Sequence, residues 1–215
     1  MEESLEERKM EFEKVDNQED DLHEVKFATP EDFGSRKIRI AGIAPESIVD
    51  GPGIRFAIFT QGCIHNCPGC QNQHTHDFSG GHEITFSEIL SEIEENPLLD
   101  GVTFSGGDPM FQAEALVPLA REIKERGLNL TVYTGFVYEK IMAQKERYPH
   151  MLELLTFADL LVDGPFIMEQ RSLSLKFRGS TNQRILDVQA SLSQGRAVLH
   201  QLQLDEMQEH PEYFE

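Results

Sequence analysis

The sequence lacks several features that would assign it to common classes of protein. No stretch approaches the roughly 18 uninterrupted apolar residues that a membrane helix requires. Residues 1–10, MEESLEERKM, are acidic and have no apolar run, so they do not resemble a secretory signal. Lysine and arginine are not clustered as the phosphate contacts of a general nucleic-acid binder require. These absences predict a cytoplasmic protein with no membrane and no nucleic-acid partner.

Negative charge is concentrated at the two ends of the chain. Of the net charge of -19, residues 1–35 carry -9 and residues 201–215 carry -5, which leaves -5 for residues 36–200. Both ends have too few apolar residues to offset the entropy of ordering, so we expect them to be disordered or weakly helical. The simpler interpretation is that the acidic ends keep the protein soluble, and the alternative is that they dock a partner. The prediction is an extension at 1–35, one domain at 36–200 and an acidic tail at 201–215.

Short apolar runs alternate with helical patterns between residues 36 and 200. Thr85 and Glu88 fit a capping box at a helix start, and Gly127 fits the position just beyond a helix end. Alternating strands and helices predict a mainly parallel α/β sheet, and the few β/α steps favour a partial, open β/α barrel. Ligands of such sheets lie at the carboxyl ends of the strands. We expect strands at 36–44, 54–60, 101–105, 128–134, 159–163 and 196–200, and helices at 85–96, 111–127, 137–147 and 185–194.

All three cysteines of the chain lie in one loop after the strand expected at 54–60. Cys63, Cys67 and Cys70 have the spacing C-x3-C-x2-C. Three cysteines cannot all pair with one another, so a disulfide framework is not expected in a reducing compartment. Three thiolates leave a tetrahedral metal one ligand short, and they leave one iron of an iron–sulfur cluster free to bind a substrate.

Three histidines near the cysteines keep a second kind of metal site open. His65, His74 or His76 could supply the fourth ligand of a zinc site. Each is also an ordinary loop histidine in the plain interpretation, and His65 is expected to face solvent. The cysteine spacing alone therefore fits zinc and an iron–sulfur cluster equally well.

The motif SGGDP, residues 105–109, directly follows another expected strand. Gly106 and Gly107 allow a ligand to approach the backbone closely, and Asp108 adds negative charge beside Ser105. The alternative is a simple strand-to-helix turn in which Asp108 caps a helix that begins at Pro109. Because this motif and the cysteine loop are expected at the same sheet edge, we predict that they share an amino-acid-like ligand.

Taken together, these motifs resemble a known superfamily. C-x3-C-x2-C followed by a GGDP turn resembles the radical S-adenosylmethionine superfamily. VDGPGIRFAIFTQGC (49–63) is similar to the activating enzymes of glycyl radical proteins. The runs CPGCQN (67–72), TFSGGDP (103–109), VYTGF (132–136), LVDGPFIMEQ (161–170) and FRGSTNQRI (177–185) resemble the anaerobic, class III ribonucleoside-triphosphate reductase activating proteins. The resemblance covers about residues 38–190.

The resemblance implies cofactors, a reaction and partners. In that family the three cysteines hold one 4Fe–4S cluster per chain, and the methionine part of S-adenosylmethionine chelates the fourth iron. Reductive cleavage of S-adenosylmethionine gives a 5′-deoxyadenosyl radical, which generates a glycyl radical on the anaerobic ribonucleoside-triphosphate reductase. A low-potential donor such as flavodoxin or ferredoxin would supply the electron. A fourth cysteine would occupy the place of S-adenosylmethionine.

The resemblance also implies roles for individual residues. Gly69, Cys70 and Gln71 should face the adenosine part of the cofactor, and Gly106 and Gly107 should meet its methionine amino group. Many members of the superfamily have an aromatic residue where this chain has Gly69, and relatives often have Tyr where it has Gln71. Both departures lie at positions that the resemblance implies for the contact with adenine.

Two further groups are candidate site residues. Asp50, Gly51, Pro52 and Gly53 form a small-residue turn in which Asp50 can accept a peptide N–H, so we expect it to position the partner. A set of polar residues lines the cofactor or partner edge in one interpretation and satisfies buried backbone groups in the other. This set is Asp163, Arg178, Asn182 and Gln183.

Two other functions compete with this assignment. One is a different activase or a small-molecule radical enzyme with the same cluster. The RGSTNQ run (178–183) argues against other activases, and DGPG (50–53) argues against a small-molecule enzyme. The other is a zinc-binding adaptor without catalysis. Metal content distinguishes the adaptor from the enzymes, because thiolate-ligated iron–sulfur clusters are coloured and zinc is not.

Overall fold

The computed structural model describes residues 30–213 and divides the chain into the units Met1–Phe33 and Gly34–Glu215. The described part of the first unit is the short helix α2, Pro30–Phe33. The disorder expected at residues 1–35 therefore lies almost wholly outside the described residues. The elements that follow belong to the second unit.

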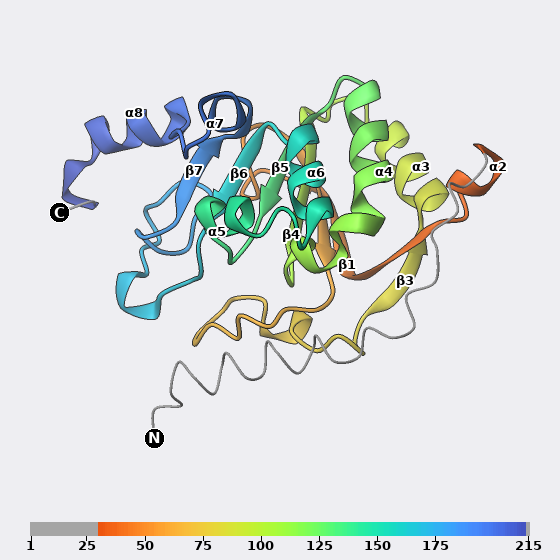
Figure 1. Cartoon of the computed structure of the whole chain (residues 1–215), viewed down its shortest axis with the longest axis horizontal. Coiled ribbons are helices and arrows are strands. Elements are labelled where there is room, and N and C mark those ends of the chain that lie inside the picture. The colour runs from red at the N-terminus through yellow and green to blue at the C-terminus, as the bar shows by residue number, and fades with distance from the viewer. Residues whose placement is uncertain (1–29, 214–215) are drawn as a thin grey trace. The chain divides into compact units, whose positions relative to one another are not determined.

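Seven strands form one open sheet in the order β3-β1-β2-β4-β5-β6-β7 (Figure 1). Strands β2, β4, β5 and β6 are parallel, and β1 and β7 are added antiparallel on either side. Because β3 pairs antiparallel with β1, it runs in the direction of β2, and the sheet is mainly parallel as predicted. The strands are β1 Lys37–Ser47, β2 Arg55–Thr60, β3 His82–Thr85, β4 Gly101–Gly106, β5 Asn129–Tyr133, β6 Leu160–Asp163 and β7 Arg184–Asp187.

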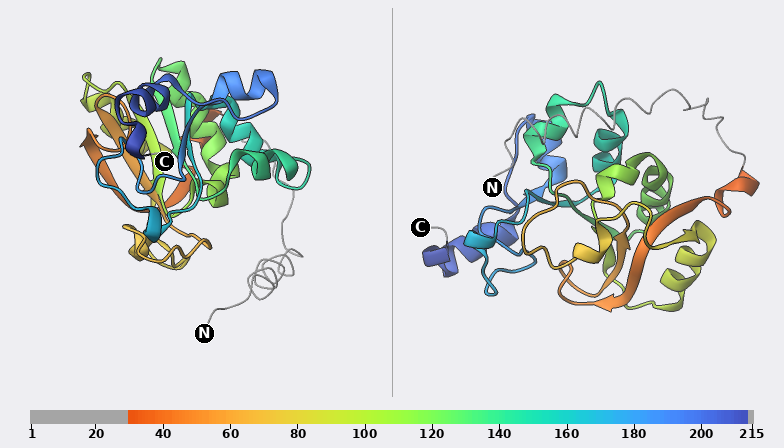
Figure 2. Two further views of the ribbon diagram at one scale, coloured as in Figure 1. Left: turned by 90° about the vertical axis from the view of Figure 1, so that its left-hand side faces the viewer. Right: turned by 90° about the horizontal axis from the view of Figure 1, so that it is seen from below.

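Helices α3, α4 and α6 lie along one face of the sheet (Figures 1 and 2). The predicted capping box is present at the start of α3, where Thr85 and Glu88 bond reciprocally. Gly127 follows the end of α4 with a φ of 77°, as its place beyond a helix end requires. The helices are α3 Phe86–Glu95, α4 Ala113–Glu125, α5 Tyr138–Ala143, α6 Pro149–Phe157, α7 Val188–Gln194 and α8 Gln201–Glu209. Within residues 30–213 the 3₁₀ turns are η2 Gln73–Thr75, η3 Pro109–Gln112, η4 Met168–Gln170 and η5 Pro211–Tyr213.

The core lies between the sheet and these helices. Strand β2, which lies between β1 and β4, is buried along nearly its whole length. Each fully buried aliphatic or aromatic side chain contributes about 1.5–3 kcal/mol. On β6 and β7 a smaller cluster of Leu160, Val162 and Ile185 packs against Leu202 of α8. Among residues 30–213, none of the helices has the length and apolar character that crossing a bilayer requires.

The carboxyl-terminal part of the fold differs from the sequence-based expectation. Residues 184–187 form β7, so the helix expected at 185–194 starts at Val188. The strand expected at 196–200 is reduced to a single bridge between Leu186 and Leu199. The acidic tail expected from residue 201 contains the helix α8, whose Gln203 and Glu206 are buried. Strand β3 and helix α6 were not predicted.

Candidate functional site

Four loops meet at the carboxyl ends of the parallel strands. The cysteine loop follows β2, the SGGDP turn follows β4, and the residues after β5 and β6 complete the ring. They enclose a cavity of about 130 Å³, lined by the three cysteines and by Gly106 and Gly107. Figure 1 shows the cysteine loop, coloured orange to yellow, beyond the lower ends of the strands. The structure thus brings together the two motifs that the strand-end rule placed at one edge.

Backbone hydrogen bonds join the SGGDP turn to the cysteine loop. Gly107 N donates to Thr60 O at 2.7 Å, and Asp108 N donates to Gly62 O at 2.9 Å. On the other side of the loop, Cys63 N donates to His76 O at 3.1 Å. The backbone that carries Cys63 is therefore held from both sides before any metal is bound.

The three cysteines are free thiols and half-buried. Burial raises the pKa of Cys63 to about 12, and the negative charge of Asp108 adds to the effect. Burial likewise raises the pKa of Cys67. Thiolates at these positions need a compensating positive charge, which a bound metal would supply, and ligation would then release protons.

The geometry disfavours a zinc site built from the nearby histidines. No group of three His, Cys, Asp or Glu side chains within residues 30–213 lies close enough to hold a single metal ion. His74 is exposed, and its carbonyl oxygen accepts Gln61 Nε2 at 3.3 Å. A cluster distributes its thiolate ligands over several irons, so it does not require three side chains within reach of one metal ion.

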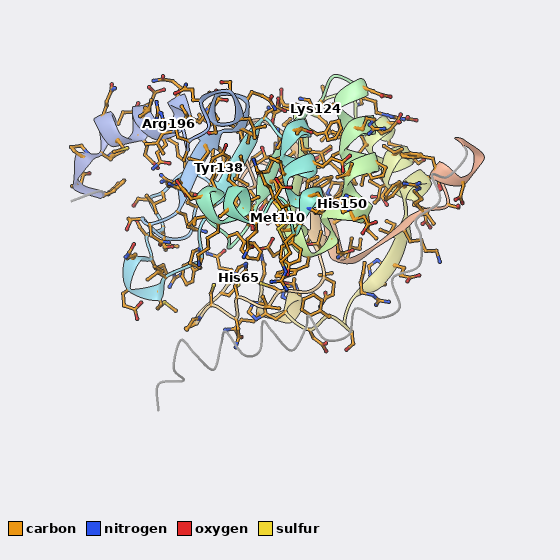
Figure 3. All side chains as sticks on the ribbon, in the orientation of Figure 1. His65, Met110, Lys124, Tyr138, His150 and Arg196 are labelled. Carbon is orange, nitrogen blue, oxygen red and sulfur yellow. The ribbon has the colours of Figure 1, made fainter. Side chains whose placement is uncertain are left out.

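His65 does not face solvent, contrary to the expectation. Its side chain is 17 % exposed, and its Nε2 lies 2.7 Å from Asp108 Oδ2. The ring also packs edge-on against Phe136, with ring centroids 4.6 Å apart. In Figure 3, His65 lies on the cysteine loop just below Met110, the second residue of η3. His65 therefore links the cysteine loop to the turn after β4.

Asp108 is part of the frame of the site. Its Oδ1 accepts Met110 N at 2.9 Å, which is the cap that the turn interpretation predicted. Its Oδ2 accepts Thr134 Oγ1 and Gly135 N, both at 2.9 Å, besides contacting His65. Only 1 % of the side chain is exposed. The carboxylate of Asp108 thus accepts hydrogen bonds from the protein on both oxygens and holds three loops together.

Gly107 has a steric role that the sequence did not reveal. A Cβ at this position would overlap the carbonyl oxygen of Gly62, the residue before Cys63. The φ of Gly107 lies outside the left-handed region, so the need for glycine is one of space alone. Close packing of the turn on the cysteine loop, as well as ligand approach, therefore requires glycine here.

Replacing Gly107 with alanine is expected to lower iron loading. The added methyl group pushes the cysteine loop away from the turn, and overpacking of this kind costs about 1–3 kcal/mol. Iron per chain after anaerobic reconstitution and the thermal midpoint would both be measured. Gly42→Ala is the matched control, because a Cβ at Gly42 meets nothing within 4 Å. Equal iron content in the two variants would contradict the steric argument.

Gly69 and Gln71 differ in their surroundings. Gly69 has a φ of 73°, and a Cβ there would overlap the end of Met168. Gln71 is exposed and lines a second cavity of about 490 Å³. Asn72, which the sequence did not single out, lines both cavities and donates its backbone N–H to Cys70 Sγ at 3.4 Å. The adenine-facing role of Gly69 and Gln71 stays a prediction.

The DGPG turn is divided between two ends of the sheet. Asp50 lines the second cavity together with Cys70. Gly51 packs near Arg55, whereas Gly53 packs against Asp100, just ahead of β4. Pro52 lines a separate cavity with Asn129 and Leu160, at the amino ends of β5 and β6. Only Asp50 of the four is therefore placed beside the cysteine end of the second cavity.

The polar residues of the RGSTNQ run mainly satisfy backbone groups. Asn182 Nδ2 donates to Pro165 O at 2.8 Å, and Gln183 Nε2 donates to Gly164 O at 3.0 Å. Asp163 accepts Tyr138 N at 2.8 Å and forms an ion pair with Arg184. Gln183 lines both cavities and Arg178 lines the second, so these two also reach the site. The contacts of Asp163 and Asn182 are therefore those expected if these residues satisfy buried backbone groups rather than line the cofactor or partner edge.

Sequence reasoning missed several residues of the cavity walls. Tyr133 and Phe166 line both cavities, and Thr134 and Gly135 line the first. All four lie at or just after the ends of β5 and β6. The strand-end rule that located the SGGDP turn could have found them, because the motifs VYTGF and DGPF occupy the same edge.

Comparisons with known proteins agree on one family. A family model described as a 4Fe-4S single cluster domain matches residues 49–186. An anaerobic ribonucleoside-triphosphate reductase-activating protein from Haemophilus influenzae is 34 % identical over 151 residues, covering 66 % of this chain and 92 % of the relative. Its counterpart from Vibrio cholerae is 35 % identical over 149 residues, with the same coverage. The one from Enterobacteria phage T4 is 32 % identical over 152 residues, covering 66 % of this chain and 90 % of the relative.

One solved structure shows a weaker similarity. QueE from Escherichia coli aligns with a TM-score of 0.39 at 17 % identity, covering 51 % of this chain and 57 % of that chain. This similarity is too low to support any conclusion, so the assignment depends on the sequence relatives and the family model. By these matches, the chain belongs to the 4Fe-4S single cluster domain family and to the anaerobic ribonucleoside-triphosphate reductase-activating proteins.

Proposed function

We propose that this chain activates an anaerobic ribonucleoside-triphosphate reductase by means of a 4Fe–4S cluster and S-adenosylmethionine. The observation that carries the proposal is the cavity at the strand ends, where three free cysteines face the turn of Gly106 and Gly107. The relatives named as activating proteins for this reductase supply the identity of the partner. The product of the reaction is a glycyl radical on the reductase.

The cysteines fit a cluster that keeps one iron open. Cys63, Cys67 and Cys70 would each ligate one iron, and the fourth iron would have no ligand from the protein. When bound, the reduced cluster supplies the electron that cleaves S-adenosylmethionine to methionine and the 5′-deoxyadenosyl radical, which takes a hydrogen atom from the partner's glycine. A low-potential donor such as flavodoxin or ferredoxin would provide that electron.

The chain's own residues bind, orient and exclude water. Gly106 and Gly107 leave space on the cavity wall for the methionine part of the cofactor. His65 and Asp108 fix the cysteine loop against the turns after β4 and β5. Loops fixed in this way around the cofactor would keep stray hydrogen donors away from a radical.

The second cavity offers an approach for the partner. It adjoins the first, because Cys70, Ser105, Tyr133 and Phe166 line both. A segment of the reductase entering there would meet Asp50 on one wall and the cysteine end of the site beyond. Radical abstraction requires such direct access, since the reacting atoms must come within about 3–3.5 Å.

A two-step experiment tests the proposal. Anaerobic reconstitution with iron and sulfide should give a brown protein whose visible absorption fades on reduction. With S-adenosylmethionine and dithionite, chromatography should detect 5′-deoxyadenosine, and adding the cognate reductase should give a glycyl radical signal by electron paramagnetic resonance. A colourless protein that retains one equivalent of zinc would instead support the non-catalytic adaptor.

A further inference from the structure

One segment dominates the wall of the second cavity. Residues Leu173–Gly179, called the strap below, contribute six of the residues that line this cavity. Leu173 is 82 % exposed, and on the loop before β2 Ile48 is 74 % and Val49 71 % exposed. Large apolar side chains thus lie open to solvent on both segments that border the cavity. The six residues of the strap that line the cavity are Leu173, Leu175, Lys176, Phe177, Arg178 and Gly179.

The strap is held in a strained conformation at Phe177. This residue has a φ of 58°, which is rare for a bulky side chain and persists only where surrounding contacts impose it. Its carbonyl oxygen accepts the hydroxyl of Tyr133 at 2.9 Å. On its amino side, Lys176 N donates to Glu206 Oε1 at 2.7 Å. Contacts from β5 and from α8 therefore impose the shape of the strap.

Helix α8 also neutralises both cations of the strap. The side chains of Arg178 and Glu206 form an ion pair and are 0 % and 1 % exposed. Lys176 Nζ lies 3.5 Å from Glu209 Oε2 in an exposed pair. Gln203 Oε1 accepts Ile185 N at 2.6 Å, which fixes the helix to β7. The helix lies beyond residues 49–186, which the family model matches.

We propose that the strap contacts the partner's glycine-bearing segment and that Glu206 is a positioning residue that maintains its shape. This inference rests on the proposed function. The fitting partner is an extended, uncharged stretch of polypeptide. Asp50 supplies the one carboxylate among the residues that line this cavity, beside neutral Ser105, Asn72 and Gln183, and α8 pairs both strap cations. Exposed apolar side chains at the rim would pack on the incoming segment.

A binding measurement tests the strap without depending on chemistry. Calorimetry would compare the binding of the cognate reductase to the reconstituted wild-type chain and to Leu173→Ser. We expect binding to weaken about fivefold, as for truncation of an apolar contact within an interface. Leu98→Ser is the matched control, because Leu98 is 70 % exposed and lines neither cavity of the site. Binding of Leu173→Ser at the wild-type affinity would overturn the proposed contact.

Glu206→Gln tests the positioning role. The change keeps the shape of the side chain but removes the charge beside Arg178, so circular dichroism must first show that the variant folds. We expect KM for the reductase to rise about fivefold while kcat for radical formation holds. In the double variant with Leu173→Ser the two effects should be less than additive, because Glu206 acts through the strap. Full additivity of the two effects, or an unchanged KM in Glu206→Gln, would contradict the positioning role of Glu206.

If Glu206→Gln fails to fold, Phe177→Gly takes its place. Glycine accepts the left-handed φ and leaves Arg178 and Glu206 unchanged, while it removes a side chain that packs on the cluster of Leu160, Val162 and Ile185, so circular dichroism must show that this variant folds as well. It should weaken reductase binding, and wild-type affinity would contradict the inference. If the wild-type chain binds the reductase but generates no radical, the proposed function is wrong. The comparison of binding affinities would still show whether the strap contacts the reductase.

Discussion

Replacing Cys63, Cys67 or Cys70 with alanine is expected to abolish the cleavage of S-adenosylmethionine. Each cysteine lines the first cavity, and residues 30–213 contain no other thiol that could replace a lost ligand. With two thiolates the cluster loses the arrangement in which one iron alone lacks a protein ligand. Production of 5′-deoxyadenosine under dithionite, measured by chromatography, should fall to background in all three variants.

His74→Ala is the control for these variants. His74 lies in the same loop but is exposed, and its carbonyl oxygen, the atom that Gln61 bonds, is unchanged by the substitution. Iron content and cleavage should stay at the wild-type level. Near-wild-type cleavage by any cysteine variant would contradict the three-cysteine assignment. Loss of a bound metal from His74→Ala would restore the zinc site that the spacing left open.

The central part of the fold was predictable because its signals are local. Strands β2 and β4 are buried along almost their whole length, and the three central residues of β5 are buried. The capping box of Thr85 and Glu88 spans three residues and marks the start of α3. From these elements the strand-end rule placed the cysteine loop and the SGGDP turn together, which the shared cavity confirms.

The parts that were missed depend on contacts between distant residues. His65 and Asp108 are 43 positions apart, so no local pattern indicated that the histidine would turn inward. The buried position of Glu206 depends on Arg178, 28 positions earlier, and the charge of the tail alone suggested solvent exposure. Strand β3 has four residues, none of them fully buried, and lies at the sheet edge. Such elements are stabilised by tertiary context rather than by their own propensity.

The second large effect is expected for Asp50→Ala, which should separate two activities. Asp50 lies on the wall of the second cavity, and Thr103 Oγ1 donates to its backbone carbonyl at 2.8 Å. Thr103 is in turn bonded to the fully buried Arg55, whose Nε lies 3.1 Å away. This backbone attachment survives the substitution, so alanine removes only the carboxylate.

The carboxylate of Asp50 has one oxygen to offer a partner. Ser47 Oγ donates to Oδ2, and within residues 30–213 Oδ1 has no donor. A peptide N–H of the reductase could therefore bond to Oδ1 and fix the glycine near the cysteine end of the cavity.

Radical transfer and cofactor cleavage should consequently respond differently to Asp50→Ala. Formation of 5′-deoxyadenosine by the chain alone should persist, because the cysteines and the Gly106–Gly107 turn are untouched. The glycyl radical signal with the reductase present should fall at least about tenfold, or about 1.4 kcal/mol, from lost positioning. Glu46→Ala removes an exposed carboxylate from β1 outside both cavities and should change neither signal. Equal loss of both signals in Asp50→Ala would assign this residue to the cofactor or the fold, and an undiminished radical yield would show that the carboxylate does not position the partner.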